Sequence, residues 1–271
     1  MLRPLLMAGT WIAMAAMSYQ RRQSRAFLSL VHGRPASTIE VWRNFYAFLA
    51  FLMARLRCSR GVHPAHRFRN PHDDAAMAFD ALRHSSESAL FGTFHFGYSD
   101  LLGFMLAGGG RRVAMIRRRI GNSDDVRWLA SEFGATLSMV WSNEPADLPL
   151  RLKAALDAGQ SLAIQCDRVE GSARTIVIPF LGRPHVFPFA IYHLALLFQR
   201  PVVFCMAIPD GHDTLEVLAS PIFRIQPQLD RSANLARAEA HFREVVQALE
   251  TEVRQRPQLW FNFEPLASHV R

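Results

Sequence analysis

The sequence predicts an α/β fold: one domain with a mostly parallel central sheet flanked by helices, preceded by a membrane-associated helix at the N-terminus. Two observations predict the sheet. Short apolar runs typical of buried strands recur between residues 89 and 208, and helical patterns separate them. Such strand–helix alternation is typical of parallel sheets. The uncharged apolar segment 5–17, which lies between Arg3 and Arg21, predicts the N-terminal helix.

The N-terminal segment favours association with a membrane. Segment 5–17 is short for a full span, which needs about 20 residues, and no cleavage site of a signal peptide follows it. A second helix, expected at 41–56, is apolar on nearly all sides and ends in arginines. The sequence leaves open whether segment 5–17 spans the membrane or lies along it. A pair of core helices packed on each other is the alternative.

The remaining elements follow in order after a polar connector at 58–70. Helices are expected at 71–84, 99–107, 123–133, 146–158, 187–199 and 232–255. Strands are expected at 89–94, 112–116, 135–140, 161–165, 176–180 and 201–208. Segments 214–218 and 221–225 are expected to form a hairpin at the edge of the sheet. Ser123 as an N-cap and Gly159 after a helix support two of these boundaries.

Composition limits the choice of partners. The chain of 271 residues is 50% hydrophobic and 20% charged, which fits one large domain and is too polar for a polytopic membrane protein. Its net charge of +8 favours a membrane surface with anionic lipids, or an acidic carrier or substrate. No nucleic-acid partner is expected, because no DNA- or RNA-binding motif places the charge. The three cysteines are too widely spaced for a metal site, and no metal or cofactor is expected.

The stretch 95–100, HFGYSD, carries the strongest chemical signal. His95 follows the strand expected at 89–94, and Asp100 opens the helix expected at 99–107. Both therefore lie at the edge where ligands bind in open α/β sheets. A histidine held by a carboxylate can remove a proton from a hydroxyl group. Chance produces about one such spacing in this composition, and a polar strand end beside a capped helix start is the alternative.

Other residues near this edge are candidates for binding substrate. Arg117 and Arg118 follow the strand at 112–116 and suit phosphate or an acidic carrier. Gly97 allows close approach of the backbone, and its N–H is a candidate donor to an oxyanion. A serine hydrolase is not indicated, because Ser99 lacks the Gly-x-Ser-x-Gly pattern of these enzymes.

Four sequence blocks resemble a known family. They are FGTFHFGYSD at 91–100, AIQCDRVEGSAR at 163–174, IPFLGRP at 178–184 and RPQLWF at 256–261. In this order they resemble the bacterial lipid A biosynthesis acyltransferases, the lauroyl and myristoyl transferases of the lysophospholipid acyltransferase superfamily. The resemblance covers roughly residues 40–265, and an apolar anchor lies in the matching place before them.

The resemblance implies an enzyme, a membrane-associated acyltransferase. The fatty acyl donor would be a thioester of acyl carrier protein or CoA, and the acceptor would be a hydroxyl or amine of a lipid or glycolipid. It implies an acyltransferase domain at 37–265 behind an anchor or interfacial helix at 1–22. It also implies a location at the bacterial inner membrane, with the catalytic domain facing the cytoplasm.

The resemblance also assigns roles to residues. His95 would be the general base and Asp100 its partner. Substrate-binding residues in the second and third blocks would be Asp167, Arg168, Glu170, Gly171, Arg174 and Arg183. The family usually carries a basic run after its C-terminal tryptophan, whereas Trp260 is followed by FNFEP, so the acceptor stays open. A non-catalytic lipid-binding homologue and a hydrolase using the same histidine and carboxylate are the alternative functions.

Overall fold

The computed structural model describes residues 2–58, 60–117, 136–143, 147–169, 174–211 and 213–266. The helix expected at 123–133 and three candidate residues, Arg118, Glu170 and Gly171, lie outside the described residues.

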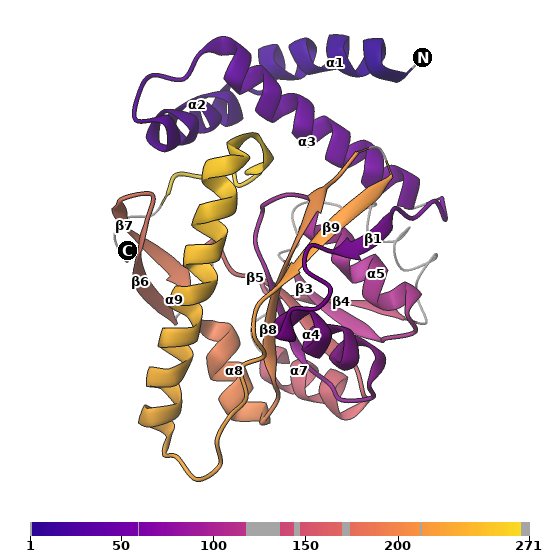
Figure 1. Ribbon diagram of the computed structural model, residues 1–271, viewed down its shortest axis with the longest axis vertical. Helices are drawn as coiled ribbons and strands as arrows, with labels where there is room; N and C mark the ends of the chain where they lie inside the picture. The colour runs from indigo at the N-terminus through magenta and orange to yellow at the C-terminus, as the bar shows by residue number, and fades with distance from the viewer. Residues whose placement is uncertain are drawn as a thin grey trace.

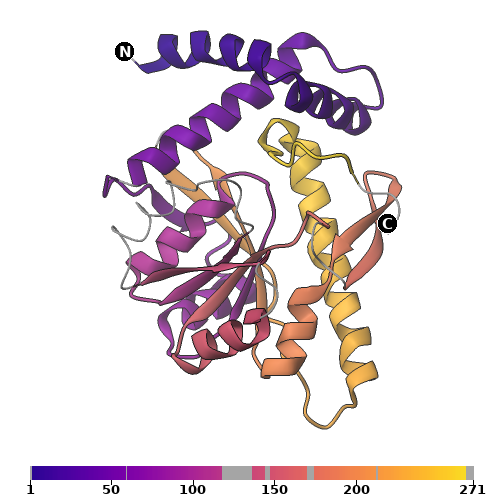
Figure 2. The ribbon, with the colours of Figure 1, turned by 180° about the vertical axis from the view of Figure 1, so that it is seen from behind.

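Three helices form a layer at one end of the molecule (Figures 1 and 2). They are α1 (Leu2–Ala16), α2 (Ser18–His32) and α3 (Thr38–Cys58). Helix α3 begins at a capping box, in which Glu40 N–H donates to Ser37 Oγ at 3.3 Å and Ser37 N–H donates to Glu40 Oε2 at 2.7 Å. The helices expected at 5–17 and 41–56 are present, whereas α2 was not expected. No helix in the described part of the chain combines the length and apolar character needed to cross a membrane.

The central sheet has the order β1-β9-β8-β2-β5-β3-β4. Its strands are β1 (Ala65–Phe68), β2 (Leu90–Thr93), β3 (Val113–Arg117), β4 (Leu137–Trp141), β5 (Ser161–Gln165), β8 (Val202–Pro209) and β9 (Thr214–Ala219). Strands β8, β2, β5, β3 and β4 run parallel, β9 is antiparallel to β8, and β1 is parallel to β9. The expectation of an α/β fold with a mostly parallel sheet is confirmed. Strand β1 was not expected, because its residues AHRF are largely exposed at the edge.

Helices cover both faces of the sheet. Helices α4 (Asp74–His84) and α5 (Leu102–Gly108) lie on one face, and α8 (Ala190–Phe198) and α9 (Arg231–Gln255) on the other (Figure 1). Successive side chains of β2 point to opposite faces of the sheet. Phe91 meets Phe79 of α4, with ring centroids 6.1 Å apart. Phe94 stacks at 5.4 Å on Phe204, which in turn meets Phe242 of α9. Helix α7 (Leu148–Asp157) packs against β4 and β5.

A separate hairpin pairs β6 (Thr175–Phe180) with β7 (Arg183–Pro188) and packs on α9. The helix expected at 187–199 therefore begins only at Ala190, because the preceding residues are paired as a strand. The edge hairpin expected from 214–218 and 221–225 is wrong. Strand β9 pairs instead with the longer apolar strand β8, and Phe223 makes only an isolated bridge with Val202.

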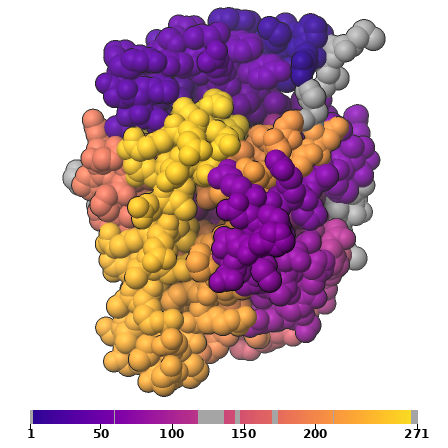
Figure 3. Space-filling view, in the orientation of Figure 1, coloured from indigo at the N-terminus to yellow at the C-terminus, as the bar shows by residue number. Residues whose placement is uncertain are grey.

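The C-terminal segment 257–263 lies between the helical layer and the sheet. It begins with the short helix η3 (Pro257–Leu259), and Trp260 then bridges to Phe96, just beyond β2. Phe27 of α2 stacks on the Trp260 ring at 5.3 Å, and Phe51 of α3 stacks on Phe261 at 5.6 Å. This segment therefore joins the helical layer to the edge of the sheet where β2 ends. Figure 3 shows the helical layer as a continuous cap over that end of the molecule.

Candidate active site

His95 and Asp167 meet because β2 and β5 are neighbouring parallel strands. The register pairs Thr93 with Gln165, the last residues of the two strands, and His95 and Asp167 each follow two residues beyond these ends. His95 Nδ1 lies 2.8 Å from Asp167 Oδ1, and His95 N–H donates to Asp167 Oδ2 at 3.1 Å. Both carboxylate oxygens are therefore bonded to the same histidine, once through the ring and once through the backbone.

Burial and charge set the state of this pair. The Asp167 side chain has no exposed surface, and the His95 side chain keeps 19% of its surface exposed. Burial by itself raises the pKa of Asp167, but the charge of His95, two hydrogen bonds from His95 and nearby Arg168 together lower that pKa below its ordinary value. An ionised carboxylate accepts the Nδ1 proton, which leaves Nε2 of a neutral imidazole as the basic nitrogen.

Asp100 has other partners than the sequence led us to expect. Gln165 Nε2 donates to Asp100 Oδ1 at 2.8 Å, and an Arg117 guanidinium nitrogen lies 3.5 Å from Asp100 Oδ2. Asp100 sits on the short helix η1 (Ser99–Leu101), and Arg117 ends β3. The carboxylate that hydrogen-bonds His95 in the structure is Asp167, because the strand order places β5 directly beside β2.

Gly97 is required by the turn between His95 and η1. Its φ is 61°, a left-handed conformation, and a Cβ at this position would collide with the carbonyl oxygen of Ala207. Its N–H donates to Leu259 O at 2.8 Å. That N–H is therefore engaged within the protein, and this structure does not offer it as a donor to an oxyanion.

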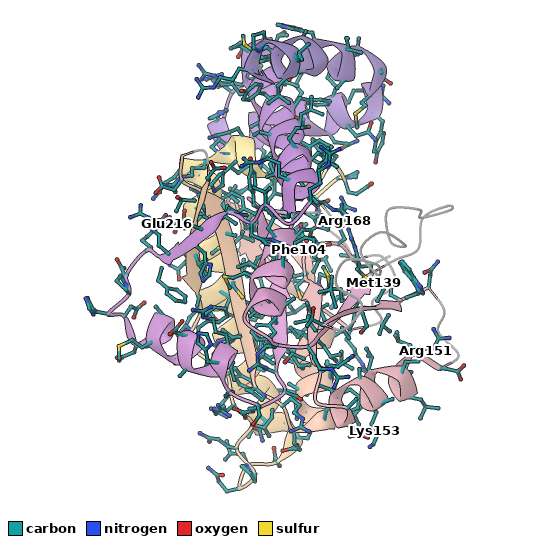
Figure 4. All side chains as sticks on the ribbon, turned by 90° about the vertical axis from the view of Figure 1, so that its right-hand side faces the viewer. Phe104, Met139, Arg151, Lys153, Arg168 and Glu216 are labelled. Atoms are coloured by element: carbon teal, nitrogen blue, oxygen red, sulfur yellow. The ribbon has the colours of Figure 1, made fainter. Side chains whose placement is uncertain are left out.

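The remaining candidate residues lie on other segments or make other contacts. Arg168 follows Asp167 directly, and its Nε donates to Asn262 Oδ1 at 3.0 Å. Figure 4 shows Arg168 at the height where α3 meets the ends of the strands. Arg174 is exposed just before β6, and Arg183 is exposed at the start of β7, on the separate hairpin.

Comparison with known families shows to which family the chain belongs. A family model described as bacterial lipid A biosynthesis acyltransferase matches residues 2–266, nearly the whole chain. The chain belongs to this family. The resemblance found in the four sequence blocks is thereby confirmed. Among curated proteins, none has a sequence that matches this member of the family.

The sequence did not point to two side chains of the candidate site, Gln165 and Asn262. Gln165 bonds Asp100, and Asn262 bonds both Arg168 and the backbone of Asp167. Gln165 is the last residue of β5, and a polar residue ending an apolar strand was a signal for the sheet edge. Asn262 carried no such signal, because it lies in an irregular segment more than 90 residues away from its partners.

Proposed function

We propose that this protein transfers a fatty acyl group from a thioester of acyl carrier protein or CoA to a hydroxyl or amine of a lipid or glycolipid. The single observation that carries the proposal is the Asp167–His95 pair at the carboxyl ends of β5 and β2 in a member of this family. His95 Nε2 removes the proton from the acceptor as its oxygen or nitrogen attacks the thioester carbonyl. Asp167 holds the imidazole tautomer and stabilises the imidazolium that forms.

The transfer needs no covalent acyl-enzyme, because the acceptor itself is the nucleophile. Attack forms the new acyl bond and a tetrahedral oxyanion, whose collapse breaks the carbon–sulfur bond and releases the carrier thiol. The imidazolium returns its proton to the thiolate. The N–H groups of Tyr98 and Leu101 already donate to Ala207 O and Tyr98 O. We therefore assign the backbone N–H groups of Ser99 and Asp100, in the first turn of η1, as donors to the oxyanion.

Two arginines at the same edge of the sheet as His95 and Asp167 suit the charged parts of the substrates. Arg117 at the end of β3 is oriented by Asp100, and Arg168 by Asn262. Guanidinium groups bind phosphate through paired hydrogen bonds. We assign these two arginines to the phosphate of the acceptor or of the carrier.

A groove of mixed character between the helical layer and the sheet suits an acyl lipid, because it offers both apolar and charged side chains. It has a volume of about 710 Å³. Leu6 of α1, Ala50 and Met53 of α3, and Tyr98 from the turn after His95 line its apolar part, and Arg3, Arg57 and Asp213 line it as well. Burial raises the pKa of Tyr98 to about 12, because the phenolate would be removed from water there.

We also propose that the helical layer docks on the cytoplasmic face of the bacterial inner membrane. Leu5 and Ile12 of α1 are 72% and 70% exposed, and Trp11 between them is 53% exposed. Exposed Arg22 and Arg25 lie on the adjoining α2. Apolar side chains beside arginines suit a helix lying in an anionic lipid surface.

The test combines purified protein with acyl-loaded carrier, or with acyl-CoA, and a total lipid extract from the host. Mass spectrometry should show an acceptor lipid heavier by one acyl group with the wild type and none with His95→Ala. Consumption of the thioester at the same rate without any acceptor would identify a hydrolase instead. No thioester consumption and no product with any donor would contradict the proposal.

A further inference from the structure

Asn262 lies in the irregular segment after η3 and makes contacts that the proposed reaction does not explain. Only 5% of its surface is exposed. Its Nδ2 donates to the backbone carbonyl of Asp167 at 3.1 Å, and its Oδ1 accepts from Arg168 Nε at 3.0 Å. The orientation of the amide is unambiguous, because a carbonyl only accepts and a guanidinium only donates.

The segment that carries Asn262 also holds the main chain of His95. Phe261 N–H donates to His95 O at 2.7 Å, and Gly97 N–H donates to Leu259 O at 2.8 Å. The backbone of this segment thus holds His95, and the side chain of Asn262, the residue after Phe261, holds Asp167. One short segment therefore fixes the positions of His95 and Asp167 relative to each other.

We propose that Asn262 is a positioning residue of the active site: it fixes the main chain of Asp167 and the guanidinium of Arg168 so that the Asp167 carboxylate meets His95 Nδ1. This inference rests on the proposed function of that pair. Asn262 does not touch the reacting atoms; it acts through Asp167. A displacement of about 1 Å in such a supporting contact lowers rates by about 100-fold in other enzymes.

The chain offers a matched control in Asn234, near the start of α9. Asn234 is 2% exposed, its Oδ1 accepts from Gln226 N–H at 3.0 Å, and its Nδ2 donates to the carbonyls of Gln226, Leu229 and Asp230. Replacing Asn234 removes a buried amide of similar bonding from the first turn of α9, outside the site. Asn234→Ala therefore shows what loss of stability alone does to the protein, and serves as the control for Asn262→Ala.

The first measurement needs no substrate. The Nδ1 proton held between His95 and Asp167 should give a low-field proton resonance, assigned by its absence in His95→Gln. We expect this resonance to be lost or broadened in Asn262→Ala and in the nearly isosteric Asn262→Asp, and to be retained in Asn234→Ala. An unchanged resonance in Asn262→Asp would overturn the proposal, whatever activity the protein has.

The second measurement is steady-state transfer. Asn262→Asp keeps an acceptor for Arg168 but loses the donor to Asp167, so we expect kcat to fall at least tenfold with KM changed by less than about threefold. Asn234→Ala should keep kcat even where its unfolding midpoint falls as far as that of Asn262→Ala. Wild-type kcat in Asn262→Asp would overturn the inference. Absence of transfer by the wild type would instead count against the proposed function, and the resonance would still decide the role of Asn262.

Discussion

The two ring nitrogens of His95 have different surroundings. Nδ1 is bonded to Asp167, and Nε2 is the nitrogen that acts as the base in the proposed reaction. Asp100, which the spacing of the sequence favours, is instead bonded to Gln165 and paired with Arg117. The two carboxylates thus have separate partners, so substitution can tell their proposed roles apart.

Replacing each carboxylate by its amide should separate these roles. Asp167→Asn favours the wrong imidazole tautomer, so we expect kcat to fall by about 100-fold or more. Asp100→Asn frees Arg117 while the His95–Asp167 bond persists, so we expect a higher KM and a change in kcat of less than about tenfold. Steady-state kinetics of both variants test this. An equal loss of kcat in both would assign the partner role to Asp100.

The lowered pKa of Asp167 also makes stability depend on pH. A carboxyl group whose pKa is depressed by folding stabilises the folded state above its ordinary pKa of about 3.9, and this contribution is lost as the pH falls through the folded value. The pKa of Asp167 is lowered in this way, against its burial, by His95 and Arg168. We expect Asp167→Asn to unfold more easily than the wild type at about pH 6. The difference in the free energy of unfolding should shrink below about pH 4 in urea titrations. A difference that stays constant with pH would contradict this.

At the scale of elements, a buried amide attaches the helical layer to the C-terminal segment 257–263. Asn44 of α3 accepts from Ser24 Oγ of α2 at 2.7 Å and donates to the carbonyls of Gln258 and Trp260, each at 2.9 Å. Trp260 precedes the residue whose N–H bonds His95 O. The helical layer is therefore attached, by polar as well as aromatic contacts, to the segment that holds the main chain of His95.

Truncating this amide should loosen the attachment. Asn44→Ala leaves the buried carbonyl of Trp260 and the partly buried carbonyl of Gln258 without their donor, so we expect it to lower the free energy of unfolding by about 1–3 kcal/mol. Chemical denaturation followed by tryptophan fluorescence measures the change. Ser37→Ala removes an exposed cap of the same helix and should cost about 1 kcal/mol. A smaller effect for Asn44→Ala than for Ser37→Ala would show that the aromatic contacts alone hold the layer.

At the scale of the whole molecule, exposed apolar side chains are concentrated on the N-terminal layer, and the groove opens beside it. Docking this face on a membrane would bring a lipid acceptor to the groove that reaches Tyr98. The helical layer, which forms the cap in Figure 3, is therefore the surface on which the proposed membrane docking can be tested.

Negative charge introduced on the exposed face of α1 should release the protein from lipid vesicles. We expect Leu5→Asp combined with Ile12→Asp to reduce flotation with anionic vesicles at least tenfold, because two exposed apolar side chains leave the interface. Leu150→Asp with Leu197→Asp is the control, since these leucines are 68% and 65% exposed on α7 and α8. Equal flotation of the two double variants would show that α1 is not the docking face.

The sequence by itself determined the α/β class, the parallel strands around β2 and the position of His95 at a strand end, because apolar runs and their spacing are local properties. The four blocks also identified the family. The order of the strands was a tertiary property: it depends on which strands pair, and it put Asp167 rather than Asp100 on the His95 ring. Only the tertiary structure brings Asn262 to His95 and Asp167, because its contacts join residues more than 90 positions apart and produce no pattern in the local sequence.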